Sequence, residues 1–101
     1  MRRNIIIYFL QRKRDTADKL FYELVEKELL ANNPTERLVR SYAGNWARCI
    51  DGTQIEMRRA VEGARGLWWT TAYIDSDIDK DIIQDVLIPS GKGSKDIIYF
   101  N

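Results

Sequence analysis

The run N-I-I-I-Y-F-L at residues 4–10 is the feature that most constrains how this chain can fold. After Asn4 its residues are β-branched, aromatic or otherwise apolar, and no polar residue alternates with them. That pattern is typical of a strand buried on both faces at the centre of a sheet. A chain of 101 residues can build one modest hydrophobic core. We therefore expect a single domain, residues 1–101, around a central strand at Asn4–Leu10.

The segments before and after residues 33–66 carry local signals for helices and strands. Asp15 or Thr16 can cap a helix in which apolar residues recur at spacings of three and four up to about Ala31. Similar reasoning predicts a strand at 67–74, a helix at 78–87 that Pro89 ends, a flexible loop at 90–95 and a final strand at Asp96–Phe100.

The middle of the chain, residues 33–66, allows two interpretations. Asn33 followed by Pro34 is a helix start signal, and apolar residues at helical spacing continue to Ile50. A second helix over 53–65, capped by Gly66, is then the favoured interpretation. The alternative makes Asp51-Gly52 the turn of a hairpin that joins Trp46–Ile50 to Thr53–Arg58.

These elements predict an α+β fold, a small two-layer domain with helices on a mixed sheet. If the middle supplies a strand, the order becomes ferredoxin-like (βαββαβ), with the first and last strands as neighbours and an extra helical segment in the middle. The segments W-W-T-T-A-Y-I-D-S-D, Leu87-Ile88-Pro89 and D-I-I-Y-F resemble the closing half of small ferredoxin-fold proteins of the Cas2 and GhoS type. Cas2-like nucleases carry a metal-binding Asp at the end of strand 1, where this chain has Phe9-Leu10-Gln11. A metal-dependent nuclease of Cas2-like fold is therefore only the third hypothesis.

Composition limits the chemistry. The chain has no His, which removes the commonest general base near neutral pH and most zinc sites. Its single Cys, Cys49, lies on an apolar stripe and is expected to be a buried structural residue without a disulfide. We expect no enzymatic activity and no cofactor. We also expect a cytoplasmic location, because no apolar run is long enough for a membrane span or a signal peptide.

Two motifs resemble ligand sites and fail at decisive positions. The alternating acids from Asp75 to Asp85 suggest a calcium loop, but Lys80 and Val86 stand where Gly and Glu are required. We expect these acids to cap a helix and predict no metal site. The loop from Gly91 to Ser94 lacks the spacing and position of a phosphate-binding loop.

Aromatic and arginine side chains carry the main functional hypothesis. On simple strand alternation, Trp69 and Tyr73 share one face of their strand, and Trp68 lies on the other. Trp, Tyr and Arg dominate protein interface hot spots. We therefore expect a non-enzymatic protein-interaction module, of which a small phage or mobile-element inhibitor is one form. Its expected partner-binding residues are Trp68, Trp69, Tyr73, Arg58, Arg59 and Arg65.

A single-stranded RNA or DNA binder is the alternative function. Arg65-Gly66 before Trp68 and Trp69 is a partial match to an RNA-recognition motif, in which strand aromatics stack on bases. The residues expected to bind nucleic acid are Arg65, Trp69, Tyr73, Tyr8 and Lys92. The net charge of +1 is far from the basic balance typical of such domains, and a homodimer stays open as a further form of assembly.

Overall fold

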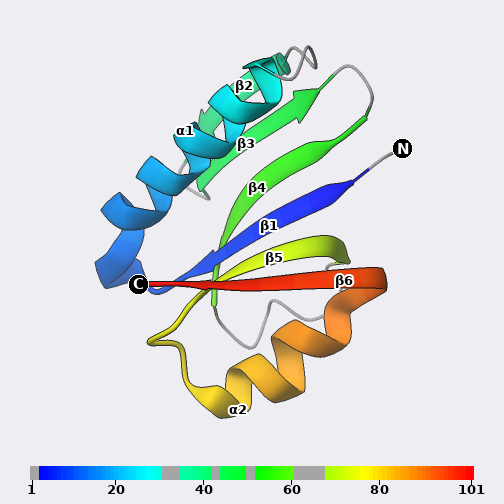
Figure 1. Ribbon diagram of the computed structural model, residues 1–101. Helices are drawn as coiled ribbons and strands as arrows, with labels where there is room; N and C mark the ends of the chain where they lie inside the picture. The colour runs from blue at the N-terminus through cyan, green and yellow to red at the C-terminus, as the bar shows by residue number, and fades with distance from the viewer. Residues whose placement is uncertain (1–2, 31–34, 42–43, 50–51, 61–67) are drawn as a thin grey trace.

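The computed structural model describes residues 3–30, 35–41, 44–49, 52–60 and 68–101. All strands join one mixed sheet in the order β2-β3-β4-β1-β5-β6 (Figure 1). The α+β class and the mixed sheet expected from the sequence are therefore confirmed.

The first strand, β1 (Asn4–Phe9), lies at the centre of the sheet, as its apolar run predicts. All six of its residues are buried. A short 3-10 helix, η1 (Gln11–Lys13), leads into α1 (Arg14–Leu30), close to the predicted helix bounds. β1 runs parallel to both of its neighbours, β4 and β5.

The described parts of the middle at 35–41, 44–49 and 54–59 are strands, so the favoured helical interpretation is wrong there. Three strands lie here: β2 (Thr35–Ser41), β3 (Gly44–Cys49) and β4 (Gln54–Arg59). β3 pairs antiparallel with β2 on one edge and with β4 on the other. Gly52 adopts a φ of 89°, a left-handed conformation that glycine tolerates best, next to the β3–β4 connection. The antiparallel pairing of β3 with β4 agrees with the alternative hairpin joining Trp46–Ile50 to Thr53–Arg58. Ile50, Asp51 and the expected Gly66 cap lie outside the described residues. Helical spacing misleads here because burial alternates along β3 and β4, with Ala47, Cys49, Ile55 and Met57 buried, and strand pairing outweighs the local pattern.

The last third of the chain forms a strand, a helical connection and a second strand. β5 (Trp69–Asp75) is followed by α2 (Lys80–Ile82), the π-helix η3 (Ile83–Leu87) and the 3-10 helix η4 (Ile88–Ser90). β6 (Gly91–Phe100) then pairs in parallel with β5. The loop predicted at 90–95 is replaced in part by strand, because β6 begins at Gly91. The pairing passes from Trp69–Gly91 directly to Thr71–Asp96, so residues 92–95 form no pairs with β5.

Helices cover both faces of the sheet, which corrects the two-layer expectation (Figure 1). Ile5, Ile7 and Phe9 point to the α1 side and pack with Ala17 and Phe21 among others. Ile6 and Tyr8 point to the other side, toward a cluster formed with residues of α2 and η3. We name these the α1 side and the α2 side of the sheet. The ferredoxin-like order is not confirmed: β1 pairs with β4 and β5, and β6 pairs with β5 instead of β1.

An irregularity in β5 changes which way its first residue points. The pairing of β5 with β6 shifts register between Trp69 and Thr71. Trp69 is fully buried with Ala72 and Ile74 on the α2 side, and its indole N–H donates to the Leu87 carbonyl at 3.1 Å. The expected sharing of one face by Trp69 and Tyr73 is therefore wrong, because strict alternation fails at a bulge.

Candidate functional site

In the part of the chain that the structure describes, the outer edge of β6 combines an edge without a partner strand with exposed apolar side chains. β6 ends the strand order, so only one of its edges has a partner strand in this sheet. Ile98 and Tyr99 on this strand are 43% and 53% exposed, the highest exposed fractions among the large apolar residues that the structure describes. Edge strands with exposed apolar side chains are templates for pairing with another chain.

The peptide groups of this edge can be oriented from one hydrogen bond. The Phe100 carbonyl accepts a bond from the Ser76 N–H at 2.9 Å, so it points toward the β5 side. Backbone groups alternate along a strand, and the N–H and C=O of one residue point the same way. The N–H groups of Ile97 and Tyr99 therefore point away from β5, toward the free edge.

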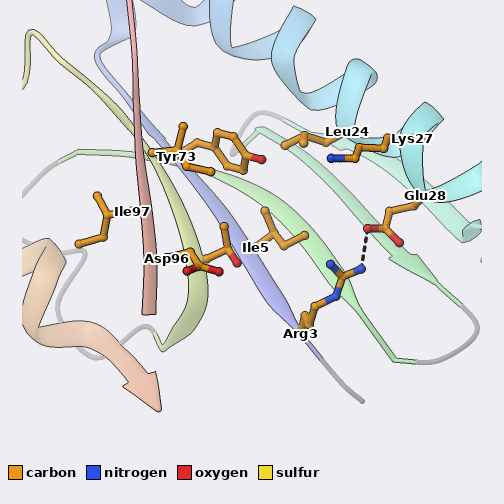
Figure 2. A pocket seen from close by; sticks show the side chains of 10 residues that line it. Arg3, Ile5, Leu24, Lys27, Glu28, Tyr73, Asp96 and Ile97 are labelled. Carbon is orange, nitrogen blue, oxygen red and sulfur yellow. Dashed lines mark hydrogen bonds and ion pairs between the residues drawn. The ribbon is translucent and has the colours of Figure 1, made fainter. Parts of the chain in front are cut away.

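A groove of about 450 Å³ lies beside β6 on the α1 side (Figure 2). Its floor comes from β1, β5 and β6, and α1 forms one wall. We name it the α1-side groove; its lining includes Ile5, Leu24, Lys27, Tyr73, Asp96 and Ile98. The volume is within the range of pockets that hold ligands or inserted side chains.

The charged rim of the α1-side groove is partly neutralised. Arg3, just before β1, forms an ion pair with Glu28 of α1 at 2.6 Å, on the side of the groove where these two elements meet. Figure 2 shows Lys27 reaching from α1 toward Tyr73, with Asp96 on the opposite side, at β6. Asp96 is exposed and has no ion-pair or hydrogen-bond partner among the described side chains. Asp96 is therefore the acid of this groove that lies on the edge strand itself.

A second hollow of about 310 Å³ lies near the end of β6 on the α2 side. We name it the α2-side groove; Ser76, Lys80, Ile83, Gln84 and Tyr99 line it. Lys80 is exposed at the start of α2 and likewise has no ion-pair partner among the side chains described. The free edge of β6 thus has a groove on each face, with an acid on one side and a base on the other.

A separate charged cluster joins the ends of β1 and β5. Lys13 lies 3.2 Å from the fully buried Asp75 and 2.9 Å from Asp77, and Arg12 lies 3.6 Å from Asp77. Asp75 also accepts bonds from the Leu10 N–H at 3.3 Å and the Asp77 N–H at 2.9 Å. This cluster satisfies its charges internally and fixes two neighbouring strand ends.

The ion pairs of this cluster shift the pKa values of its members. The hydrogen bond and charge of Lys13 hold the pKa of Asp77 below its ordinary value. The same hydrogen bond to Asp77, with a smaller contribution from Asp75, raises the pKa of Lys13. Both shifts favour the charged forms, as expected for a stabilising ion pair.

The expected partner-binding residues do not form one surface. Trp69 is buried in the core, so its assignment to a contact surface is wrong. Trp68 is 39% exposed beside the start of β5, whereas Arg58 and Arg59 lie at the opposite, carboxyl end of the parallel strands. Tyr73 is the one member that lines the α1-side groove. Arg65 lies outside the described residues.

The expected nucleic-acid residues are also separated. Tyr8 and Trp69 are fully buried on the α2 side, so neither can stack on a base, and Tyr73 lies on the α1 side. Burial, with a smaller contribution from Glu56, raises the pKa of Tyr8 to about 12. The side chain of Lys92 and all of Arg65 lie outside what the structure describes. This set does not form a common stacking face.

The acidic run has a structural role where its bonds are described. The Asp79 side chain accepts from the Asp81 N–H at 2.8 Å and caps α2, as helix capping predicts. Among the described residues, no three His, Cys, Asp or Glu side chains are grouped to hold a metal ion. Cys49 is a buried free thiol.

Sequence reasoning missed Ile98, Tyr99, Asp96 and Lys80 as site residues. The run D-I-I-Y-F was correctly predicted as a strand, but its composition matches that of a buried central strand. The glycines and lysines just before D-I-I-Y-F could have indicated an edge strand. Lys and Gly are typical of strands at the edge of a sheet and not of central strands.

Comparison of the chain with protein-family models, with curated proteins and with solved structures finds no significant match. None of the described helices has the length and apolar character needed to cross a membrane.

Proposed function

We propose that this domain is a non-enzymatic protein-binding module that takes up an extended segment of its partner along the free edge of β6. The observation that carries the proposal is that the edge exposes Ile98 and Tyr99, which point to opposite faces of the sheet. Strand addition uses the backbone groups of an edge for affinity and side-chain pockets on both faces for specificity. The edge of β6 offers both.

The packing around β6 supports this use. β5 and the α2-side cluster hold one edge and part of one face of β6, so the strand is ordered before any partner binds. A preformed strand reduces the conformational entropy lost on binding. The apolar atoms that a partner would cover are already held in place.

A proline substitution at the edge gives a direct test. Tyr99→Pro removes an N–H that points to the free edge, whereas Tyr99→Thr keeps that N–H in a residue suited to strands. We expect nuclease-treated lysate to yield a protein bound stoichiometrically to wild type and to Tyr99→Thr, but not to Tyr99→Pro. Equal capture by the proline variant would rule out strand addition at this edge. Circular dichroism and the urea midpoint of each variant establish that the fold is retained.

Single-stranded nucleic acid binding is the second candidate, at a different place. Trp46 and Arg48 lie on the face of β3 opposite the buried Ala47 and Cys49, and the Arg48 guanidinium lies 5.2 Å from the Trp46 ring. Aromatic rings and arginines on a sheet face can stack on bases and neutralise phosphates. This candidate predicts that oligo(dT) quenches Trp fluorescence at low salt and that Trp46→Ala removes the quenching. Unchanged fluorescence at low salt would exclude it.

A further inference from the structure

The two faces of the free edge differ in charge in a way that a partner strand would meet residue by residue. The register of β6 on β5 puts Ile98 opposite Tyr73, on the α1 side, and Tyr99 opposite Ile74, on the α2 side. Asp96, two residues before Ile98, shares its side. A strand added to the edge has the same alternation, so its side chains enter the α1-side groove and the α2-side groove in turn.

Among the side chains that the structure describes, the charges nearest to such a strand are of opposite sign. Asp96 faces the α1 side on β6 itself, while Arg3 and Lys27 lie farther away, at the wall formed by β1 and α1. On the other face, Lys80 lines the α2-side groove together with Tyr99. Opposite charges on directly facing strand residues are favourable, and like charges are unfavourable.

We infer that the partner segment of the proposed module carries a basic side chain facing Asp96, an apolar side chain facing Ile98 and an acidic side chain on the side of Lys80 and Tyr99. This inference rests on the proposed function, because it requires a strand at the edge of β6. For an antiparallel partner the order along the chain is acidic, apolar, any residue, basic. A parallel partner has the reverse order.

A second copy of this chain fits these charges poorly. Two-fold antiparallel pairing centred on Ile97 places Ile98 of the second copy opposite Asp96, and pairing centred on Ile98 places Phe100 there. The register that brings Lys92 of the second copy opposite Asp96 leaves Ile98 and Tyr99 beyond the start of its β6. Charge complementarity therefore favours a different protein as the occupant.

Labelled nonapeptides with blocked ends test the inference with defined probes. One contains the core Glu-Val-Thr-Arg, one contains its reverse Arg-Thr-Val-Glu, and each has a charge-swapped version in which Glu replaces Arg, so that no orientation can place a basic side chain opposite Asp96. All four have the same flanking threonines and valines. Fluorescence anisotropy gives the dissociation constants. We expect one matched peptide to bind about fivefold or more tightly than its charge-swapped version, because the side chain facing Asp96 changes from basic to acidic and the pair from attraction to repulsion.

A charge reversal in the protein completes the experiment. The variant Asp96→Lys, with Lys80 retained, should reverse the preference, so that the charge-swapped peptide binds more tightly. Equal binding of matched and swapped peptides that Tyr99→Pro still abolishes would overturn the charge pattern and leave strand addition intact. No binding by any peptide, or binding unaffected by Tyr99→Pro, would count against both.

Sedimentation equilibrium of the protein alone tests the competing occupant. We expect a monomer across the concentrations used for the peptides. A dimer that Tyr99→Pro dissociates and Tyr99→Thr does not would show that a second copy occupies the edge, and would overturn the inference of a charged partner segment.

Discussion

β1 and β6 have closely similar sequences and opposite environments. β1 carries I-I-Y-F at its end and so does β6, yet every residue of β1 is buried while Ile98 and Tyr99 of β6 are exposed. β1 has strand partners on both edges and helices on both faces, and β6 has one strand partner. The apolar residues of β1 therefore stabilise the fold, whereas Ile98 and Tyr99 of β6 are left exposed to solvent.

Replacing one isoleucine in each strand gives the largest expected contrast. Ile7→Ala in β1 should lower the free energy of unfolding by about 2–5 kcal/mol, because Ile7 is fully buried and leaves a cavity. Ile98→Ala in β6 should cost no more than about 1 kcal/mol. Urea unfolding monitored by circular dichroism measures both. Similar losses for the two variants would mean that Ile98 is covered in solution and that the contrast between the strands fails.

The buried tyrosine of β1 should make the stability of the domain fall in alkaline solution. Tyr8 is buried with no hydrogen-bond partner for its hydroxyl among the described groups, and its pKa is raised to about 12. The unfolded chain ionises near pH 10, so stability is intact below pH 10 and is lost as the pH rises toward 12.

Unfolding at pH 9 and pH 11.5 measures this difference. The loss attributable to Tyr8 should be about 2 kcal/mol at the higher pH, and Tyr8→Phe should abolish it. At pH 7 the same substitution should cost little, since no hydrogen bond is removed. Tyr99→Phe serves as the control in β6. An alkaline loss that persists in Tyr8→Phe and disappears in Tyr99→Phe would reverse the assignment of the two environments.

The adjacent tryptophans at the start of β5 extend the contrast to a single pair of residues. Trp69→Phe removes the buried bond to the Leu87 carbonyl and part of the ring volume, at an expected cost of about 1–3 kcal/mol. Trp68→Phe, at a partly exposed position, should change stability by less than about 0.5 kcal/mol. Thermal unfolding of both variants decides whether the bulge places the two rings as described. A larger loss at Trp68 would show that it does not.

The smallest effect is expected at the strand ends. Because Lys13 lowers the pKa of Asp77, the stability from this pair is present above the ordinary carboxyl pKa near 3.8 and is lost as the pH falls through the lowered value. Asp77→Asn should cause a smaller loss at pH 7 than Ile98→Ala and a weaker dependence of stability on pH below 4. The urea midpoint between pH 2.5 and 6 measures it, and an unchanged acid limb would show that the pair contributes nothing.

Local signals allowed part of this fold to be predicted. β1 and α1 were predicted near their observed bounds because composition and capping lie within the segments themselves. β3 and β4 were favoured as helix because the contacts that make them strands come from each other and from β1, far away in sequence. The bulge at Trp69 could not be predicted, since it arises in the pairing with β6.

The candidate site was less predictable than the fold. Tyr73 alone among the expected partner-binding residues lines a groove beside β6. Residue type identifies side chains that bind well, such as Trp and Arg, but not which of them face solvent. Whether a strand is central or at the edge depends on the order of strands in the sheet, and that order is not encoded within the strand.

The central place of β1 also governs how the chain folds as it is synthesised. Asn4 pairs with Gln54 and Ile5 pairs with Thr71, so the strand made first has no neighbour until much of the chain has followed. At ordinary translation rates that interval is about 3–10 s. During this time an apolar strand of the nascent chain stays without its sheet, and its apolar side chains lack the neighbours that bury them in the folded domain. Pairing at such long sequence separation also makes refolding slow for a domain of this size.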